Sequence, residues 1–346
     1  MKTTNYKEVG KIVSTVTSEM EFSGVIYIQN GKEMIHESAH GYSNRAEQIK
    51  NKINTRFGIA SGCKLFTAIG ICQLIQAGKL TVETKINECL AIDLPYFDKS
   101  VTIHHLLTHS SGIPDYFDEA VMENFEDLWK QNPMYQIKEL RDFLPLFQHQ
   151  KMMFPPGAKF HYNNAGFILL GLVIEQISGE SFTSYIEKNI FGPSEMQDSG
   201  YFSLDQLPAN TATGYIDSED GSWRTNIYSI PIKGGADGGA FTTALDMSKL
   251  WTGLLHHRLL NEEMTQRLLT PVIEVDEDSH YGYGIWIRKR NNRIFKYHVM
   301  GYDPGVSFAS SFYPESGVTM VIPSNKEGGP HKVTSEIEKM LMIEKE

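Results

Sequence analysis

The spacing of hydrophobic and polar residues near the two ends of the chain predicts the secondary structure there. Apolar residues at helical spacing predict a helix over residues 5–20, and Asn5 with Glu8 resembles a capping box at its start. Two β-rich runs, 22–29 and 33–39, are joined by Asn30-Gly31, which is a strong hairpin signal. The N-terminal end therefore predicts one helix followed by a β-hairpin.

Strand pairs also dominate the C-terminal end. The runs 281–288 and 293–300 flank Asn291-Asn292, and the runs 306–313 and 318–323 flank a Glu-Ser-Gly turn. The tail, 332–343, has the periodicity of a helix with one apolar face, and the middle of the chain, from about 61 to 197, is mainly helical.

Strands at both ends with helices between them predict an α+β fold, an α/β sandwich. One antiparallel sheet built from both termini would be flanked by helices, with a mainly helical lobe inserted between its two halves. We expect residues 1–60 and 232–346 to form the sheet domain and residues 61–231 the helical lobe, with the active site between them. The glycine-rich stretch 234–239 lacks the features of a P-loop or a dinucleotide fingerprint, so it predicts a tight connection.

Composition narrows the class of protein. The chain has 346 residues, of which 41% are hydrophobic and 21% charged, so it can bury a large core. Its 32 basic and 42 acidic residues give a formal charge of −10, which argues against nucleic acid as a partner, because no excess of cations can neutralise phosphates. Three cysteines, Cys63, Cys72 and Cys89, suggest reduced thiols in a reducing compartment.

The start of the chain has no apolar segment of the kind found in signal peptides. The longest apolar stretch, 65–75, is too short to cross a membrane. We therefore expect a cytoplasmic protein without a membrane span, or an extracytoplasmic one if a leader has been removed.

One lysine lies in a helix that is otherwise uncharged. Between Phe57 and Gly78 the only charged residue is Lys64, and apolar neighbours surround the predicted helix on nearly every side. Burial favours the neutral amine of a lysine, and Ser61 lies one helical turn before it, so a hydroxyl and a base can meet. This is the pattern of an activated serine nucleophile. For an isolated S-x-x-K, a capping serine and a lysine that reaches solvent are the commoner explanation.

A tyrosine and two asparagines precede a second helix that is almost free of charge. A Pro-Pro-Gly turn leads to Tyr162, Asn163 and Asn164, and the apolar residues that follow predict a buried helix. The dipole of that helix would favour a phenolate, and near an ammonium Tyr162 could relay protons between a serine hydroxyl and a leaving group. The alternative is that Tyr162 is a rim residue and that one of the asparagines only caps the helix.

A predicted strand end is the third place that could carry chemistry. The strand ending at Gly301 lets a substrate approach the backbone, and exposed N–H groups there could form part of an oxyanion hole, although a strand followed by an Asp-Pro-Gly turn is the commoner meaning. His105 and His109 have the spacing of a zinc helix, but Leu106 occupies the position of the general-base Glu. We interpret both histidines as structural and predict no metal site.

These three places, in this order, resemble the serine β-lactamase and penicillin-binding protein superfamily, especially its class C-like, DD-peptidase and esterase branch. Ser61 and Lys64 match the S-x-x-K element, and Tyr162 and Asn164 match the Y-x-N element. The runs 57–60, 77–80, 103–113, 169–171 and 238–243 are also similar to the family. The resemblance extends from about residue 24 to residue 325.

The resemblance implies a β-lactamase/transpeptidase-like fold and a covalent acyl-enzyme mechanism. Ser61 would attack a carbonyl carbon, while Lys64 and Tyr162 share the work of general base and general acid. Asn164 would hold a substrate amide or stabilise Lys64, and the backbone N–H groups of Ser61 and of the strand near Tyr302 would bind the oxyanion.

The implied activity is that of a serine hydrolase that needs no cofactor and acts on an ester, an amide, a β-lactam or a D-amino-acid peptide. Its partner would be a small-molecule or short-peptide acyl substrate. The alternative is a penicillin-binding or sensor-type homologue that binds or is acylated without efficient turnover. The intact S-x-x-K and Y-x-N residues favour the enzyme.

The third element departs from the family pattern. The family has K-T-G or H-x-G on this strand, whereas His298 precedes Gly301 by three residues. Either Gly301 is the motif glycine, which leaves Val299 at the position of the cation, or His298 takes that role through a local bulge. A missing cation would weaken binding of the carboxylate that penicillins and D-alanyl peptides share, so we expect inefficient β-lactam hydrolysis.

Overall fold

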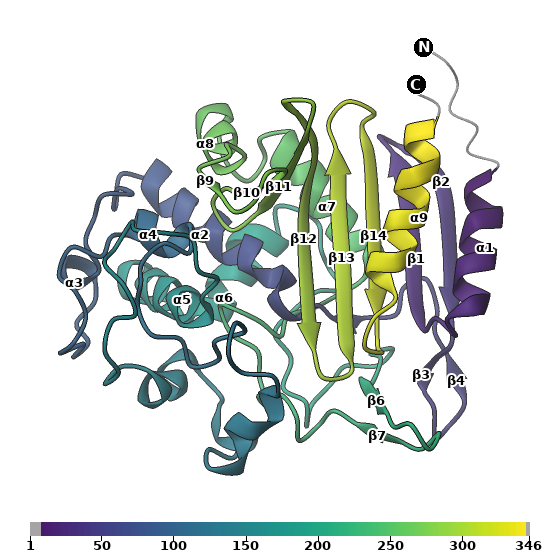
Figure 1. Cartoon of the computed structure of the whole chain (residues 1–346), viewed down its shortest axis with the longest axis horizontal. Coiled ribbons are helices and arrows are strands. Elements are labelled where there is room, and N and C mark those ends of the chain that lie inside the picture. The colour runs from purple at the N-terminus through teal and green to yellow at the C-terminus, as the bar shows by residue number, and fades with distance from the viewer. Residues whose placement is uncertain (1–7, 344–346) are drawn as a thin grey trace.

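The computed structural model describes residues 8–343, and an antiparallel sheet forms its centre (Figure 1). The strand order is β2-β1-β14-β13-β12-β11-β10-β9, so strands from both ends of the chain lie side by side. The strands are β1 (Gly24–Asn30), β2 (Glu33–His40), β9 (Ile273–Glu274), β10 (Ser279–Tyr281), β11 (Trp286–Arg290), β12 (Arg293–Asp303), β13 (Val306–Tyr313) and β14 (Val318–Ser324). The predicted α+β sandwich is therefore confirmed.

Helices cover both faces of the sheet (Figure 1). α1 (Val9–Glu19) and α9 (Pro330–Ile343) pack on each other and on one face. α2 (Lys64–Gln76) and α7 (Ala244–Leu255) belong to the larger core on the opposite face. Strand β1 shows the division, because Val25 and Tyr27 join the larger core and Ile26 and Ile28 join the cluster under α1 and α9.

Two of the predicted elements near the ends of the chain differ in their described bounds, and the start of the first falls partly outside the described residues. The predicted helix 5–20 is observed as α1, which begins at Val9; Glu8 forms no side-chain cap, and Asn5 lies outside the described residues. The predicted strand 281–288 is divided into β10 and β11. The division arises because the Gly282 N–H donates to the Ile285 carbonyl and Gly284 adopts a φ of +69°, which together make a turn.

The middle of the chain contains two long buried helices, α2 and α5 (Asn164–Ser178), which pack on each other. The other helices there are short: α3 (Ile86–Cys89), α4 (Ile103–Leu107), η3 (Phe125–Lys130), η4 (Met134–Gln136), η5 (Leu140–Leu146), α6 (Phe182–Ile186) and η6 (Glu187–Phe191). Irregular segments connect them, so the region is less helical than the sequence predicts. The division of the chain into two domains stays a prediction.

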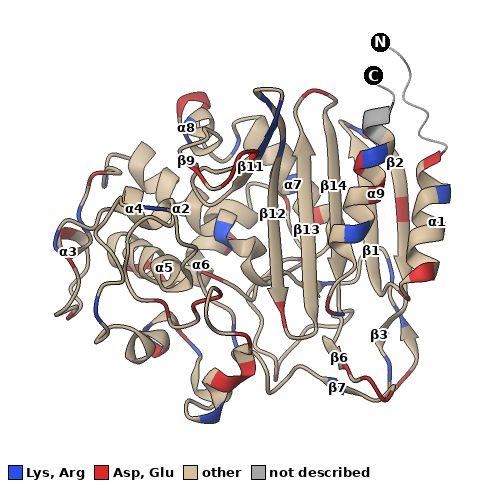
Figure 2. Ribbon diagram, viewed as in Figure 1, with Lys and Arg blue, Asp and Glu red and all other residues tan. Residues whose placement is uncertain are grey.

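Short elements complete the fold. They are the 3-10 turn η2 (Ala60–Cys63), helix α8 (Glu262–Leu268) and three small strand pairs, β3 (Tyr42–Asn44) with β4 (Ile49–Lys50), β5 (Phe57–Gly58) with β8 (Phe241–Thr242), and β6 (Tyr215–Asp217) with β7 (Trp223–Thr225). Figure 2 shows charged residues mainly on the outer helices, loops and hairpin ends, with none on β13 or β14. Within residues 8–343, no single helix is long and apolar enough to span a membrane, and one bent pair, Asn164–Ser178 with Phe182–Phe191, meets that test by length and composition alone.

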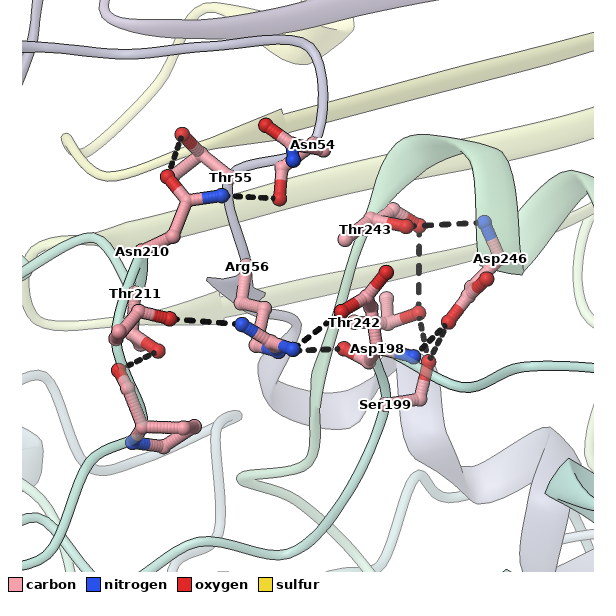
Figure 3. Close-up of polar contacts among 12 residues, drawn as sticks. Asn54, Thr55, Arg56, Asp198, Ser199, Asn210, Thr211, Thr242, Thr243 and Asp246 are labelled. Carbon is pink, nitrogen blue, oxygen red and sulfur yellow. Dashed lines mark hydrogen bonds and ion pairs between the residues drawn. The ribbon is translucent and has the colours of Figure 1, made fainter.

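A polar network fixes the segment that leads into β5 (Figure 3). Arg56 forms an ion pair with Asp198, and the backbone N–H of Asp198 donates to Asp246 Oδ2 on α7 at 2.7 Å. On the other side, Thr55 Oγ1 donates to Asn210 Oδ1 at 3.2 Å. Because these contacts join three separate parts of the chain, they hold the entry to η2 in place beside the loop 198–212.

Candidate active site

Ser61 and Lys64 lie in contact where η2 passes into α2. Lys64 Nζ is 2.9 Å from Ser61 Oγ. Lys64 is 2% exposed, whereas Ser61 is partly exposed and lines a cavity. The hydroxyl and the buried amine that the S-x-x-K spacing predicts are therefore together.

The buried amine of Lys64 has three polar contacts. Besides Ser61 Oγ, it donates to Asn164 Oδ1 at 2.8 Å and to the backbone oxygen of Asp237 at 2.7 Å. Both of these amide oxygens can only accept, so two protons of the amine are committed. The proton between Lys64 and Ser61 can belong to either atom, which is the arrangement needed for transfer from the hydroxyl to the amine.

Tyr162 faces the same pair from the residue before Asn163, the N-cap of α5. Its ring centroid is 4.9 Å from Lys64 Nζ, and Tyr162 lines the same cavity as Ser61. Burial raises the pKa of Tyr162 well above its ordinary value, and Glu119 raises it further, while the nearby Ser61 hydroxyl lowers it. The sequence predicts a dipole that favours a phenolate, but burial keeps the phenol protonated, so Tyr162 is suited to donate a proton.

A buried histidine supports Tyr162. The ring centroids of His109 and Tyr162 are 4.3 Å apart, and His109 Nδ1 accepts the backbone N–H of Asn163 at 3.0 Å. Burial lowers the pKa of His109 well below its ordinary value, and Lys64 lowers it further, so the ring stays neutral. His105 Nδ1 instead accepts the backbone N–H of Thr102 at 3.2 Å. Within the part of the chain that the structure describes, no group of three or more His, Cys, Asp or Glu residues could hold a metal ion.

Asn164 joins Lys64 to a buried carboxyl group. Its Nδ2 donates to Asp115 Oδ2 at 3.3 Å, which orients the amide so that Oδ1 faces Lys64. Asp115 also accepts the backbone N–H groups of Asn164 and Ala165 at 2.8 and 2.9 Å. Burial raises the pKa of Asp115 to about 7, although these backbone bonds lower it. Asn163 caps α5 by accepting the Gly166 N–H at 2.7 Å, so one asparagine caps the helix and the other, Asn164, contacts Lys64.

The glycine-rich stretch 234–239 supplies a residue that the sequence analysis does not assign. The stretch is a tight connection, as predicted, in which the Gly235 N–H donates to the Gly238 carbonyl at 2.8 Å. It brings the backbone oxygen of Asp237 to Lys64, and the Asp237 carboxylate accepts a hydrogen bond from the Tyr116 hydroxyl. Burial raises the pKa of Asp237, and Lys64 opposes this.

Strand β12 passes Ser61 at Gly301. A Cβ atom on Gly301 would lie 2.1 Å from the Ile59 carbonyl oxygen and 2.8 Å from Ser61 N, so glycine is required for this approach. Pairing of β12 with β13 is regular from Tyr297 to Asp303, and no bulge turns His298 toward the site. Val299 has the same parity as Gly301 and belongs to the larger core.

The predicted substrate-binding role of His298 needs correction for the same reason. His298 does not line the cavity; its ring stacks on Trp286, with centroids 6.4 Å apart. Burial lowers the pKa of His298 well below its ordinary value, and Lys296 and His331 lower it further, so the ring is neutral. The geometry therefore favours Gly301 as the motif glycine, with apolar Val299 at the position of the cation.

One cavity of about 670 Å³ collects the other candidate residues, a volume typical of small-molecule sites. Ser61, Tyr162, Asn164, Gly301 and Tyr302 line it, and Lys64 contacts Ser61 and Asn164 from the core side. Most of the remaining wall is apolar and includes Phe117, Phe125, Phe143, Phe202, Leu204, Leu207, Ile227, Ile230 and Phe241.

A serine and a lysine at the start of a buried helix, beside a sheet built from both termini, define the serine β-lactamase and transpeptidase fold. The family model described as Beta-lactamase matches residues 12–342, and the chain belongs to this family. The structure is similar to the penicillin-binding protein from Bacillus halodurans, with 55% identity, a TM-score of 0.92, and coverage of 95% of this chain and 99% of that one.

Two further relatives agree with this assignment. The octameric penicillin-binding protein homologue from Pyrococcus abyssi has 25% identity and a TM-score of 0.85, and the match covers 99% of this chain and 78% of that one. Penicillin-binding protein 4* of Bacillus subtilis (strain 168) is 29% identical over 344 residues, which is 94% of this chain and 73% of the relative.

Proposed function

We propose that the protein is a serine hydrolase that cleaves ester or amide bonds through a covalent acyl-enzyme formed on Ser61. The observation that carries the proposal is the set of contacts made by Lys64 Nζ. Two of them are with oxygens that can only accept, so they hold two protons of the amine and direct its third position at the Ser61 hydroxyl, where a proton can pass between the two groups. Membership in the Beta-lactamase family supports the same chemistry.

In the proposed first step, Ser61 Oγ attacks the substrate carbonyl carbon and its proton passes to Lys64 Nζ. The carbonyl oxygen becomes an oxyanion, which the backbone N–H groups of Ser61 and Tyr302 would stabilise, because β12 approaches Ser61 closely at Gly301. Tyr162 then donates its phenolic proton to the leaving nitrogen or oxygen, and the scissile bond breaks. Lys64 returns a proton to Tyr162 before the next cycle.

Water completes the proposed reaction by attacking the acyl carbon. Its proton passes to Tyr162 as Tyr162 gives one to Lys64, and Lys64 returns a proton to Ser61 Oγ as the acyl bond breaks. This step separates the hydrolase from the alternative, a penicillin-binding or sensor-type homologue that is acylated without efficient turnover. Val299 offers no charge to a substrate carboxylate, so penicillins and D-alanyl peptides are expected to react less efficiently than uncharged esters.

The test is hydrolysis of p-nitrophenyl butyrate by the wild type and by Ser61→Ala, with intact-mass detection of an acylated protein. We expect continuous turnover in the wild type, and neither turnover nor adduct in Ser61→Ala. The matched control is Ser248→Ala, since the buried Ser248 hydroxyl has no partner within the described structure and its loss leaves the site unchanged. Turnover by Ser61→Ala would refute the nucleophile, and a stable adduct without turnover would establish the alternative.

A further inference from the structure

The side chains around the cavity carry charge of only one sign. Of the described residues that line it, Glu119, Glu123, Asp237 and Asp303 are acidic, and none is Lys, Arg or His. Lys64 is adjacent, but its three contacts with protein atoms are already formed. A charged substrate group that enters the cavity therefore meets carboxyl groups.

Asp303 is the partly buried acid of this set that has no bonding partner; the exposed Glu119 and Glu123 also form no hydrogen bond or ion pair within residues 8–343. The Asp237 carboxylate accepts a bond from Tyr116, whereas the Asp303 carboxyl has no hydrogen bond or ion pair with any described residue. Burial, together with the charges of Asp237 and Glu119, raises the pKa of Asp303 to about 7 against the opposing effect of Lys64.

Two basic residues in this part of the structure, Arg224 and Lys326, are already paired with carboxylates. Arg224 lies 2.5 Å from Glu126, and Lys326 lies 3.0 Å from Asp217. A second hollow continues past Asp303 and is lined by the acidic residues Glu123, Glu126 and Glu327 with Arg224. Both spaces that Asp303 borders therefore carry an excess of acid.

The position of Asp303 on β12 places it on one particular side of the scissile bond. Val299, Gly301 and Asp303 alternate along one face of the strand, and two residues of a strand advance about 7 Å. Tyr162 stacks on Trp286, which pairs with His298, so the proton donor lies toward the Val299 end. Asp303 lies beyond Gly301 at the other end, which is the acyl side of a substrate whose leaving group faces Tyr162.

We propose that the preferred substrate carries an ammonium group on the acyl side of its scissile bond, and that Asp303 is the residue that binds it. The inference rests on the proposed function and specifies the substrate class of the same site. Aromatic side chains support a cation here, because Phe117, Phe125 and the half-exposed Tyr302 line both hollows beside Asp303.

The test compares three p-nitrophenyl esters: the uncharged butyrate, the cationic 4-(trimethylammonio)butyrate and the anionic monoglutarate. We expect the wild type to hydrolyse the cationic ester with a kcat/KM about tenfold or more above the butyrate, and the monoglutarate most slowly. The preference should shrink in 1 M NaCl because salt screens the charges.

Three variants assign the preference to one residue. In Asp303→Asn the ratio of cationic to uncharged kcat/KM should fall toward one, and in Asp303→Lys it should invert in favour of the monoglutarate. Asp205→Asn is the control for net charge, since Asp205 is exposed outside the cavity, and it should retain the wild-type ratio. Circular dichroism and melting curves verify that each variant is folded.

Binding to Ser61→Ala separates this inference from the proposed function. Calorimetry with Ser61→Ala should show the cationic ester binding more tightly than the butyrate, and Ser61→Ala/Asp303→Asn should lose that difference. Wild-type turnover of all three esters with a ratio of one, or an unchanged ratio in Asp303→Asn, would overturn the ammonium site and leave the hydrolase standing. Selective binding of the cation without any turnover would support the site and refute the hydrolase.

Discussion

Strand β12 lies so near the nucleophile at Gly301 that a specific effect can be predicted for Gly301→Ala. The added Cβ atom would lie 2.1 Å from the Ile59 carbonyl oxygen, 2.8 Å from Ser61 N and 2.9 Å from Gly62 N. All three are backbone atoms, so no side-chain rotation can relieve the contact. At Gly301, β12 is paired with β13, whereas its pairing with β11 ends at His298.

The size of the effect follows from the overlap. A carbon and a carbonyl oxygen make contact at about 3.3 Å, so one segment must move by roughly 1 Å. The movement separates β12 from the turn around Ser61, because the overlapping atoms belong to these two backbones. A displacement of this size costs about a hundredfold in rate, and loss of one oxyanion donor costs about a hundredfold to a thousandfold. We therefore expect kcat of Gly301→Ala to fall by about a hundredfold or more.

The assay is hydrolysis of p-nitrophenyl butyrate together with a thermal melt of each variant. The matched control is Gly10→Ala on α1, where the added Cβ meets only His36 Nδ1 at 3.9 Å. That control should keep the wild-type kcat and gain up to about 1 kcal/mol of stability, because alanine is the better helix former. A Gly301→Ala enzyme with kcat within threefold of the wild type and an unchanged melting temperature would refute the reasoning.

Three further predictions test the proton donor, the uncompensated acid and one buried ion pair. Tyr162→Phe should lower kcat about a hundredfold for an anilide and much less for a p-nitrophenyl ester, whose leaving group needs no proton; equal losses would contradict its role. Below pH 4 Asp303→Asn should match the wild type in urea denaturation, but at pH 8 it should be more stable by about 2 kcal/mol. The pKa of Asp303 in the folded protein is about 7, which is above that of an unfolded aspartate, so the folded wild type loses stability as pH rises from 4 to 8. The expected free energy is smaller than the full pKa difference would give, because Asp303 is partly exposed. Glu338→Gln should cost about 3 kcal/mol by the same assay, since it leaves the buried Lys296 ammonium, 2.7 Å away, without its counter-charge, whereas the more exposed Glu336→Gln should cost under about 0.5 kcal/mol.

Features that depend on neighbouring residues could be predicted from the sequence. Asn30-Gly31 predicts its hairpin because Gly31 takes the left-handed φ of +57° that the turn requires. Asn291 and Asn292 do the same, with φ values of +48° and +60°. The pair of Ser61 and Lys64 belongs to this group, since one helical turn is enough to bring them together.

Other parts of the site could not be predicted, because they depend on contacts between distant segments. Asn164 and Asp237 contact Lys64 from 100 and 173 residues further along the chain, and no spacing encodes either approach. The choice between His298 and Gly301 required the register of β12, since a shift of one residue turns every side chain to the opposite face. The protonated state of Tyr162 likewise depends on burial, which opposes the helix dipole.

The residues of the site lie on two kinds of element, the helices of the core and the irregular segments of the cavity wall. Ser61, Lys64 and Asn164 lie at the ends of α2 and α5, whose apolar residues fill the larger core, so core packing fixes their positions. Most of the cavity wall comes instead from irregular segments such as 117–123, 202–207 and 226–232. Asp303 differs from that wall, because it lies at the end of a strand of the central sheet, where it pairs with Val306 of β13. Its backbone is therefore held by the sheet at a set distance from Gly301, whereas most of the wall has no such pairing, and we expect charge to set selectivity more strictly than size.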